Sequence, residues 1–399
     1  MEEVKQRLRE TVLSSFDYSS EITEDVLYGR IDGAILAEAR ESFLSLSDKQ
    51  RLRKELYYSI RGLDILEELL EREDITEIMI NGAEHIFIEE NGKLRTWERR
   101  FESKQKLEDI VQRIVAGANR TVNEASPIAD ARLADGSRVN ILLPPVALNG
   151  PIVTIRKFSK EPFTMERLID LEAISLDAAE FLRKLVQAKY NIFVCGGTGS
   201  GKTTFLNALT AYIPSSERII TIEDAAELRV NGIENLVRLE VRSKNTEGCA
   251  EISIRELIRA ALRMRPDRII VGEVRGAEAI DMLQAMNTGY DGSLSTGHGN
   301  SVTDMLDRLE TMVLLGAEIP LMAVRKQIAS AIDILVHLGR MHDGRRKVLE
   351  VSEVLSCRDG EIETNPLYVL RDDGMLCRTG NVFVQQKKLR SMGWQECEE

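Results

Sequence analysis

The chain has 399 residues, more than one hydrophobic core usually holds, which predicts two or three domains. Its hydrophobic fraction of 43% and charged fraction of 30% are typical of a globular protein. The formal net charge of −12 disfavours a polyanionic partner, since nucleic-acid binding depends largely on Lys and Arg contacts to phosphates. Direct binding of nucleic acid is therefore not expected.

No stretch approaches the roughly 18 apolar residues that a membrane-spanning helix needs, and the first residues lack the apolar segment of a signal peptide. We therefore expect the protein in the cytoplasm. The 5 cysteines lie far apart without the paired spacing of a zinc site, and their odd number suits reduced thiols. We expect neither disulfides nor a metal cluster.

The first part of the chain predicts helices. Over residues 1–72 the sequence is rich in Glu, Arg and Leu, and apolar residues such as Val4, Leu8 and Val12 recur at helical spacing. This pattern predicts a small helical bundle or arm.

The second part, residues 73–156, predicts an α+β domain. Short β-type runs are separated by Asn81-Gly82 and Asn91-Gly92, which are strong hairpin signals and indicate a meander. An amphipathic helix is expected to begin near Ser103, a plausible cap residue. Residues 157–170 predict a linker to the next domain.

The third part, residues 171–399, predicts an α/β fold. Apolar strands expected at residues 190–195, 218–222 and 268–271 alternate with helical segments, which is typical of a parallel sheet with helices on its faces. Further strands and a polar tail are expected near the end of the chain.

A phosphate-binding loop follows the first of these strands. The segment Gly196-Gly197-Thr198-Gly199-Ser200-Gly201-Lys202-Thr203 has the full spacing of such a loop, with a strand before it and a helix after it. Glycines let backbone N–H groups converge on phosphate oxygens, and the helix directs its positive end to the same anion. Lys202 is expected at the β- and γ-phosphates and the Thr203 hydroxyl on Mg²⁺. The nucleotide-binding candidates are Gly197, Thr198, Gly199, Ser200, Gly201, Lys202, Thr203 and Thr204.

Acidic residues follow two neighbouring strands, where a parallel sheet would present them to the γ-phosphate. Glu273 follows the strand 268–271 and can orient the attacking water or a Mg²⁺-bound water. Glu223, after the strand 218–222, is the second catalytic candidate. Asp224 is expected to shape the site or the metal shell. The sequence thus predicts a Mg²⁺-dependent ATPase of the P-loop class.

His298 lies between two glycines in a segment dense with small polar residues. A lone histidine is usually structural or exposed. Here we expect a sensor that hydrogen-bonds near the γ-phosphate and relays its loss to the rest of the fold.

Together these motifs resemble, in order and spacing, the Walker A, Asp box, Walker B and His box of type II/type IV secretion and pilus ATPases. The segments are the phosphate loop, Ile222-Glu223-Asp224, Gly272-Glu273-Val274-Arg275-Gly276 and Thr288-Gly289 leading to Thr296-Gly297-His298. The CpaF/TadA branch, the Flp or tight-adherence pilus motors, is resembled in particular through Asp130 to Asn140, Thr154 to Phe158 and Gln327 to Asp333.

The resemblance implies a PAS-like N-terminal domain and a RecA-like C-terminal domain that hold ATP and Mg²⁺ between them. It also implies a homo-hexamer at the cytoplasmic face of a membrane, working with an integral membrane platform protein of a pilus or secretion apparatus. In such motors, arginines of the N-terminal domain and linker close on the phosphates. The matching positions are Arg138 and Arg156.

Two other functions remain open from the sequence. A nucleic-acid motor such as a helicase uses the same RecA-type core, although the net charge disfavours it. A nucleotide-gated assembly scaffold with negligible hydrolysis is the other alternative, and Glu223 and Glu273 argue against it. GTP is disfavoured as fuel because the chain lacks the Asn-Lys-x-Asp motif that reads guanine.

Overall fold

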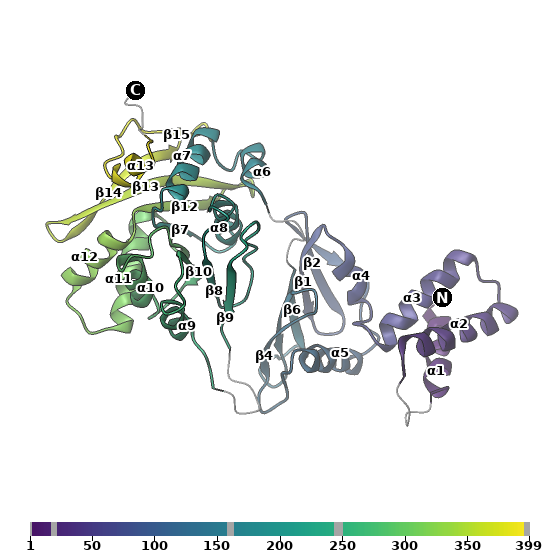
Figure 1. Ribbon diagram of the computed structural model, residues 1–399. Coiled ribbons are helices and arrows are strands. Elements are labelled where there is room, and N and C mark those ends of the chain that lie inside the picture. Colours follow the sequence, from purple (N-terminus) through teal and green to yellow (C-terminus); the bar gives the residue numbers. More distant parts are fainter. Residues whose placement is uncertain (1, 17–21, 158–162, 243–249, 395–399) are drawn as a thin grey trace. The chain divides into compact units, whose positions relative to one another are not determined.

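The structure, a computed structural model, describes residues 2–16, 22–157, 163–242 and 250–394. The chain forms two compact units, Met1–Lys160 and Glu161–Glu399. Figure 1 shows the helices and strands of each unit.

The first unit begins with helices that pack around a small apolar core. Their bounds are α1 Glu2–Ser14, α2 Glu24–Glu41 and α3 Leu46–Ile60. Helix α4 Leu66–Glu71 follows, and its Leu66 and Leu69 pack in the core of the sheet that comes next. Leu8 and Val12 of α1 are buried against α2 and α3, as their helical spacing predicted. Helix α3 begins with a capping box, in which Ser45 and Asp48 satisfy each other's backbone N–H groups.

A six-stranded antiparallel sheet follows, with the strand order β3-β2-β1-β6-β5-β4. Helix α5 (Lys104–Gly117) begins after Ser103, whose hydroxyl accepts a hydrogen bond from the Lys106 N–H at 3.1 Å. The apolar stripe of α5 packs in the same core as the sheet. The strands are β1 Ile75–Asn81, β2 His85–Glu90, β3 Lys93–Trp97, β4 Ile128–Arg132, β5 Arg138–Leu142 and β6 Ile152–Arg156.

The second unit is built on a nine-stranded sheet in the order β15-β14-β13-β12-β7-β11-β10-β8-β9. The strands from β12 to β9 in this order run parallel, and β13, β14 and β15 extend the sheet as antiparallel strands. The strands are β7 Ile192–Gly196, β8 Ile219–Glu223, β9 Leu236–Glu240, β10 Arg268–Val274, β11 Leu294–His298, β12 Ile334–Arg340, β13 Arg346–Arg358, β14 Glu361–Leu370 and β15 Leu376–Arg378.

Helices cover both faces of this sheet, so it has two apolar cores (Figure 1). One core contains α6, α7 and α8, and the other contains α9 to α12. The predicted fold class is confirmed: an α/β RecA-like domain follows an α+β PAS-like domain and a helical segment. The helices of this unit are α6 Met165–Asp170, α7 Leu176–Gln187, α8 Lys202–Thr210, α9 Ile254–Ala261, α10 Ala279–Asn287, α11 Val302–Gly316, α12 Leu321–Ala331 and α13 Lys387–Ser391.

The expected linker differs from the structure in its second half. Residues 165–170 form helix α6, whose Thr164 cap accepts a hydrogen bond from the Arg167 N–H. Met165 and Leu168 are buried in the core with α7 and α8. This segment therefore packs as part of the second unit. Residues 158–162 of the expected linker and 395–399 of the expected tail lie outside the described residues.

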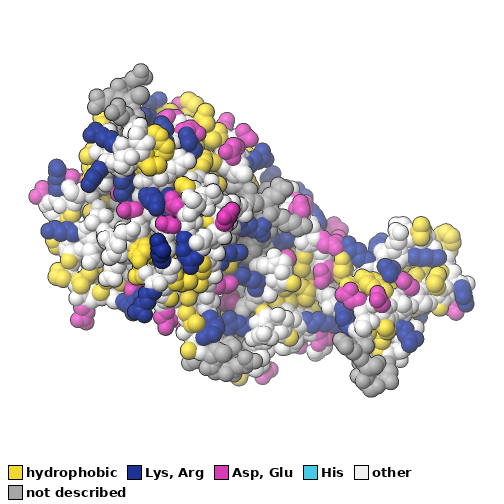
Figure 2. Space-filling view, viewed as in Figure 1, with side chains coloured by type: hydrophobic (Ala, Val, Ile, Leu, Met, Phe, Trp, Pro, Cys, Tyr) yellow, Lys and Arg dark blue, Asp and Glu magenta, His cyan; other side chains and the backbone are white. Residues whose placement is uncertain are grey.

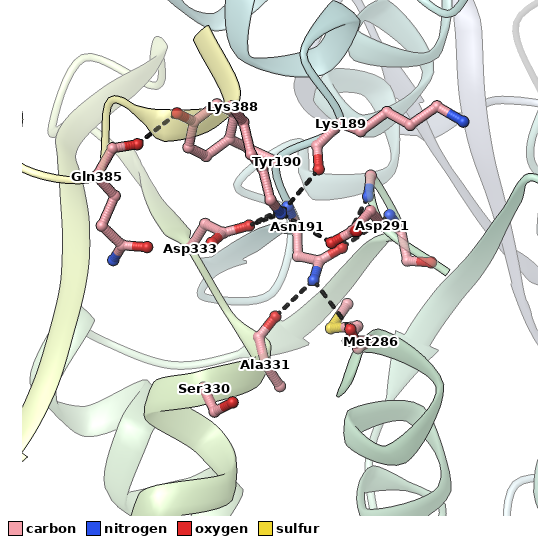
Figure 3. A network of polar contacts seen from close by, with 12 residues as sticks. Lys189, Tyr190, Asn191, Met286, Asp291, Ser330, Ala331, Asp333, Gln385 and Lys388 are labelled. Atoms are coloured by element: carbon pink, nitrogen blue, oxygen red, sulfur yellow. Dashed lines mark hydrogen bonds and ion pairs between the residues drawn. The ribbon is translucent and has the colours of Figure 1, made fainter. Parts of the chain in front are cut away.

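A buried asparagine fixes the start of β7, the strand that leads into the phosphate loop (Figure 3). The Asn191 side-chain oxygen accepts hydrogen bonds from the N–H groups of Gly292 at 2.9 Å and Ser293 at 3.0 Å. Its amide nitrogen donates to the Ala331 carbonyl at 2.8 Å, and its backbone N–H donates to the Asp333 carboxylate at 2.7 Å. Asn191 thereby links β7 to the segments that enter its two neighbours, β11 and β12.

The C-terminal helix joins the same network (Figure 3). The Lys388 ammonium of α13 donates to the carboxylates of Asp291 and Asp333, both at 2.9 Å, and to the Lys189 carbonyl at 3.0 Å. Its nitrogen also lies 5.3 Å from the centre of the Tyr190 ring. Burial raises the pKa of Asp333, and the charge of Lys388 opposes that rise. Residues far apart in the sequence therefore fix the starts of the neighbouring strands β7, β11 and β12.

Candidate active site

The phosphate loop has a backbone that requires its glycines. Gly199 and Gly201 have φ angles of 72° and 93°, in the left-handed region that favours glycine. A Cβ atom on Gly196 would lie 2.4 Å from the Leu338 carbonyl oxygen and 2.5 Å from Ser200 Oγ, so no larger residue fits there. The loop ends at helix α8, whose N-terminal N–H groups and dipole favour an anion.

Lys202 lies folded over the loop from the first position of α8. It is 8% exposed, and its Nζ donates to the carbonyls of Gly196 and Gly197, both at 3.1 Å. The same nitrogen lies 3.2 Å from His298 Nδ1. The structure therefore brings the loop lysine to the predicted sensor.

His298 stands at the end of β11, opposite Gly196 in the parallel ladder with β7. Burial lowers the pKa of His298, and the charge of Lys202 lowers it further, so the imidazole is neutral at pH 7. An ammonium group is only a donor, so Nδ1 accepts and the ring proton lies on Nε2. Nε2 is 2.8 Å from Oε1 of Glu273, the predicted catalytic acid.

An irregularity in β10 brings Glu273 to this position. Val271 pairs with Ser295 and Val274 pairs with Gly297, so three residues of β10 advance against two of β11. Such bulges bend a strand locally and change the direction of a side chain. Sequence reasoning predicted the acid at the strand end but not the bulge that orients it.

Arg275 connects Glu273 to the acidic segment after β8. Its Nε and Nη2 lie 2.8 Å and 2.5 Å from Glu273 Oε2, and its Nη1 lies 3.4 Å from Asp224 Oδ2. Sequence reasoning gave Arg275 no role. The available signal was an arginine two residues after the acid that ends a strand. Lys202, His298, Glu273, Arg275 and Asp224 form one continuous series of polar contacts.

Glu223 is the most buried acid of the site, with 3% of its surface exposed. Its Oε1 accepts hydrogen bonds from the N–H groups of Glu227 at 2.8 Å and Leu228 at 2.7 Å. Burial raises the pKa of Glu223 to about 7, and these two hydrogen bonds oppose the rise. A Cβ atom on Gly272 would lie 3.0 Å from Glu223 Cγ, so this carboxyl lies beside the residue that precedes Glu273.

The oxygen atoms at this edge of the sheet suit a phosphate chain with a hard cation. Ser200 Oγ and Glu223 Oε2 are buried without a hydrogen-bond partner among the described residues, although buried polar groups normally have one. The described residues contain no group of three His, Cys, Asp or Glu side chains that could hold a metal alone. Mg²⁺ in nucleotide sites uses one or two protein oxygens together with phosphates and water. The residues predicted for this role are Thr203, in the first turn of α8, and Asp224.

The two predicted arginines lie in the first unit. Arg138 begins β5 and Arg156 ends β6, and the two residues are direct partners in the antiparallel ladder. Arg156 is exposed and Arg138 is half-buried. The two arginines are 18 residues apart in the sequence, but the pairing of β5 with β6 brings them next to each other.

With this geometry established, comparison with known proteins identifies the family. The chain matches the family described as Type II/IV secretion system protein over residues 60–378, most of its length. The chain belongs to this family. It is 36% identical over 319 residues to the type IV secretion system protein PtlH of Bordetella pertussis, across 72% of this chain and 93% of PtlH. It is 32% identical over 329 residues to the type IV secretion system protein VirB11 of Bartonella henselae, across 72% of this chain and 91% of that protein.

A solved structure shares the fold of this member of the Type II/IV secretion system family. The X-ray structure of the ATPase DotB of Legionella pneumophila matches with a TM-score of 0.52 and 22% identity, over 73% of this chain and 79% of DotB. In the described parts of the chain, no helix combines the length and the apolar character that crossing a bilayer demands. The similarity to the CpaF/TadA branch stays a prediction.

The raised pKa of Glu223 predicts a pH-dependent effect of Glu223→Gln on stability. A folded-state pKa of about 7 against an ordinary value of 4.5 means that folding favours the protonated acid. That contribution is complete below pH 4.5, fades as the pH rises, and is lost above about pH 7. Glu223→Gln should therefore raise the melting temperature relative to wild type more at pH 8 than at pH 5.

Thermal unfolding at these two pH values measures the effect, with Glu234→Gln as the control. Glu234 is an exposed acid in the loop between β8 and β9, and its replacement should shift both melting temperatures equally. If Glu223→Gln changed the melting temperature equally at pH 5 and pH 8, the raised pKa of Glu223 would be contradicted.

Proposed function

We propose that this protein hydrolyses ATP with Mg²⁺ and that the hydrolysis drives pilus assembly or protein secretion. The observation that carries the proposal is the series of contacts from Lys202 through His298 to Glu273, which joins the phosphate loop to the acid that ends a neighbouring strand. Family membership supports the secretion role, because PtlH and VirB11 are type IV secretion system proteins. DotB, which shares the fold, is an ATPase.

The phosphate loop binds the nucleotide. Backbone N–H groups from Gly197 to Thr204 surround the phosphates, and Lys202 exchanges its two carbonyl partners for the β- and γ-phosphate oxygens. Thr203 and Asp224 would hold Mg²⁺, which when bound would spread the negative charge of the phosphates. An exposed fraction of 8% for Lys202 means that its charge acts with little screening by water.

The acids and the histidine divide the chemistry between them. Glu273 orients the attacking water and accepts its proton, while Glu223 supplies a second carboxyl group beside it. Neutral His298 accepts from Lys202 through Nδ1 and lies with Nε2 2.8 Å from Glu273 Oε1, so it registers where the lysine lies. When the γ-phosphate leaves, Lys202 returns to the loop carbonyls and His298 transmits that change to β11.

Arg138 and Arg156 deliver positive charge from the first unit. A guanidinium group is always charged and binds phosphate oxygens through two donors, so it stabilises the charge that develops during transfer. Delivery from another domain couples hydrolysis to domain closure. The parts that move against each other are the first unit, which carries Arg138 and Arg156, and the second unit, which carries the phosphate loop.

The assembly that this mechanism serves is a homo-hexamer at the inner face of the cytoplasmic membrane. Staggered closure around such a ring pushes on an integral membrane platform protein of the apparatus. The motifs that resemble the CpaF/TadA branch favour an Flp or tight-adherence pilus as the machine.

The charges of the protein disfavour the alternative function as a nucleic-acid motor. On the visible face of the second unit, Lys and Arg side chains are interspersed with Asp and Glu (Figure 2). The net charge of −12 also opposes binding to a polyanion. Stimulation of ATP hydrolysis by single-stranded DNA, lost at raised salt, would favour the helicase instead.

Glu273→Gln tests the catalytic role and the scaffold alternative together. Removal of the carboxylate should lower kcat at least about 100-fold, since a positioned general base contributes that much, while Mg·ATP still binds. Steady-state hydrolysis and equilibrium nucleotide binding measure the two effects. Asp307→Asn, which replaces an exposed acid on α11, is the control and should retain wild-type turnover. Equal, near-zero turnover in wild type and Glu273→Gln would favour the nucleotide-gated scaffold.

Arg156→Ala tests the contribution of the first unit. The substitution should lower kcat/KM for ATP at least about tenfold, because it removes a charge-assisted contact made during transfer. Arg95→Ala is the matched control, since Arg95 is an exposed arginine of the same sheet that pairs with Glu90 at 3.0 Å. Unchanged turnover and unchanged nucleotide affinity in Arg156→Ala would remove domain closure through this arginine from the account.

A further inference from the structure

The hairpin formed by β12 and β13 carries an arginine that lies against the phosphate loop, on the side of β7 away from the acids. Strand β12 runs parallel to β7, and Leu338 pairs with Gly196, the last residue of β7. β12 then continues through Gly339 and Arg340, beyond the point where β7 becomes the loop. β13 returns along it, with Arg346 opposite Arg340. The β12–β13 hairpin therefore extends past the loop.

Arg346 contacts the loop directly. Its Nε donates a hydrogen bond to the Gly199 carbonyl oxygen at 2.9 Å. Its Cδ lies 3.4 Å from the place that a Cβ atom on Gly201 would occupy, so its stem lies along the loop backbone. The two residues of this hydrogen bond are 147 positions apart in the sequence.

The charge of Arg346 is not neutralised as those of its neighbours are. Arg345 lies 2.7 Å from the Asp343 carboxylate and 3.3 Å from that of Glu172. Within the described residues, Arg346 has no carboxylate within ion-pair distance, and its one hydrogen-bond partner there is the uncharged Gly199 carbonyl. A guanidinium group has five N–H donors, and this contact uses one of them. Arg346 is exposed, so the remaining donors are accessible to a ligand.

The strand order shows which part of a nucleotide the guanidinium would meet. β11, with His298, and β10, with Glu273, lie on one side of β7, and β12 lies on the other. The γ-phosphate belongs on the side of the acids that act on it. A phosphate chain that crosses the loop from that side presents its α-phosphate toward β12. The α-phosphate would therefore meet the Arg346 guanidinium, whose charge has no carboxylate partner among the described residues.

We propose that Arg346 binds the α-phosphate of the bound nucleotide and, through Gly199, holds the loop in the shape that receives it. This inference rests on the proposed ATPase function and adds a determinant of nucleotide affinity at the same site. ATP and ADP share the α-phosphate, so Arg346 contributes equally to binding of both. It takes no part in the transfer itself, which occurs at the γ-phosphate.

The experiment measures equilibrium binding of Mg·ATP and Mg·ADP by the full chain, together with kcat and KM. Arg346→Ala and Arg346→Gln should weaken both nucleotides about tenfold and raise KM by a similar factor, the usual effect of losing a hydrogen bond to a charged group. The change in kcat should stay below threefold. Arg346→Lys should recover part of the affinity, since it retains the charge. Arg345→Ala is the matched control and should bind both nucleotides as wild type does.

Gln distinguishes the charge from the contact with the loop. A glutamine amide still donates to the Gly199 carbonyl, so wild-type affinity in Arg346→Gln would overturn the phosphate contact. A loss confined to ATP, or a fall in kcat with unchanged affinity, would overturn it as well by placing Arg346 at the γ-phosphate. The melting temperature of each variant without nucleotide shows that it is folded, and the Gln and Lys variants carry the test if Ala unfolds.

The two proposals fail in different ways. Wild-type protein that binds neither nucleotide would reject the ATPase function itself. Wild-type protein that binds both, with all three Arg346 variants unchanged, would reject the role of Arg346 alone.

Discussion

Close packing between the end of β7 and the neighbouring strand β12 determines the shape of the phosphate loop. Gly196 lies so near the Leu338 carbonyl and Ser200 that only a hydrogen atom fits in place of its side chain. At the other end of the strand, Asn191 joins β7 to the segments that enter β11 and β12. The strand is thus fixed at both ends, which fixes the starting point of the loop that follows it. Preorganised donors of this kind bind an anion at a low entropic cost.

The same arrangement couples the loop to the rest of the sheet. Lys202, on the first turn of α8, contacts His298 on β11, which contacts Glu273 on β10, and Arg275 extends the series to Asp224 after β8. In the proposed mechanism, Lys202 moves to the phosphate when the nucleotide binds, and its contact with His298 changes as a result. A series of discrete polar contacts of this type can transmit a change at the loop across three strands.

Much of the fold follows from local patterns in the sequence. The phosphate loop, the strand before it and the helix after it were predicted from glycine spacing and apolar runs, and the Ser103 cap from the helical stripe that follows it. These features depend on residues close together in the chain. The acids Glu223 and Glu273 could be placed at strand ends for the same reason, although their roles stay predictions.

The rest of the site depends on contacts that no local pattern encodes. The bulge that orients Glu273 arises from pairing between β10 and β11, and the position of Arg346 arises from the pairing of β12 with β7. Residues 165–170 were predicted as part of a linker, because the two buried residues of α6, Met165 and Leu168, find their partners only in the folded core. Tertiary packing decides such short elements.

Equilibrium titration with Mg·ATP, comparing wild-type protein with Lys202→Ala, tests the central claim most directly. The account predicts saturable binding by wild type. Lys202→Ala should bind Mg·ATP at least about 100-fold more weakly, because the buried positive charge that contacts the phosphates is removed. Equal affinity in the two proteins, or no binding by wild type, would contradict the assignment of this loop as the nucleotide site.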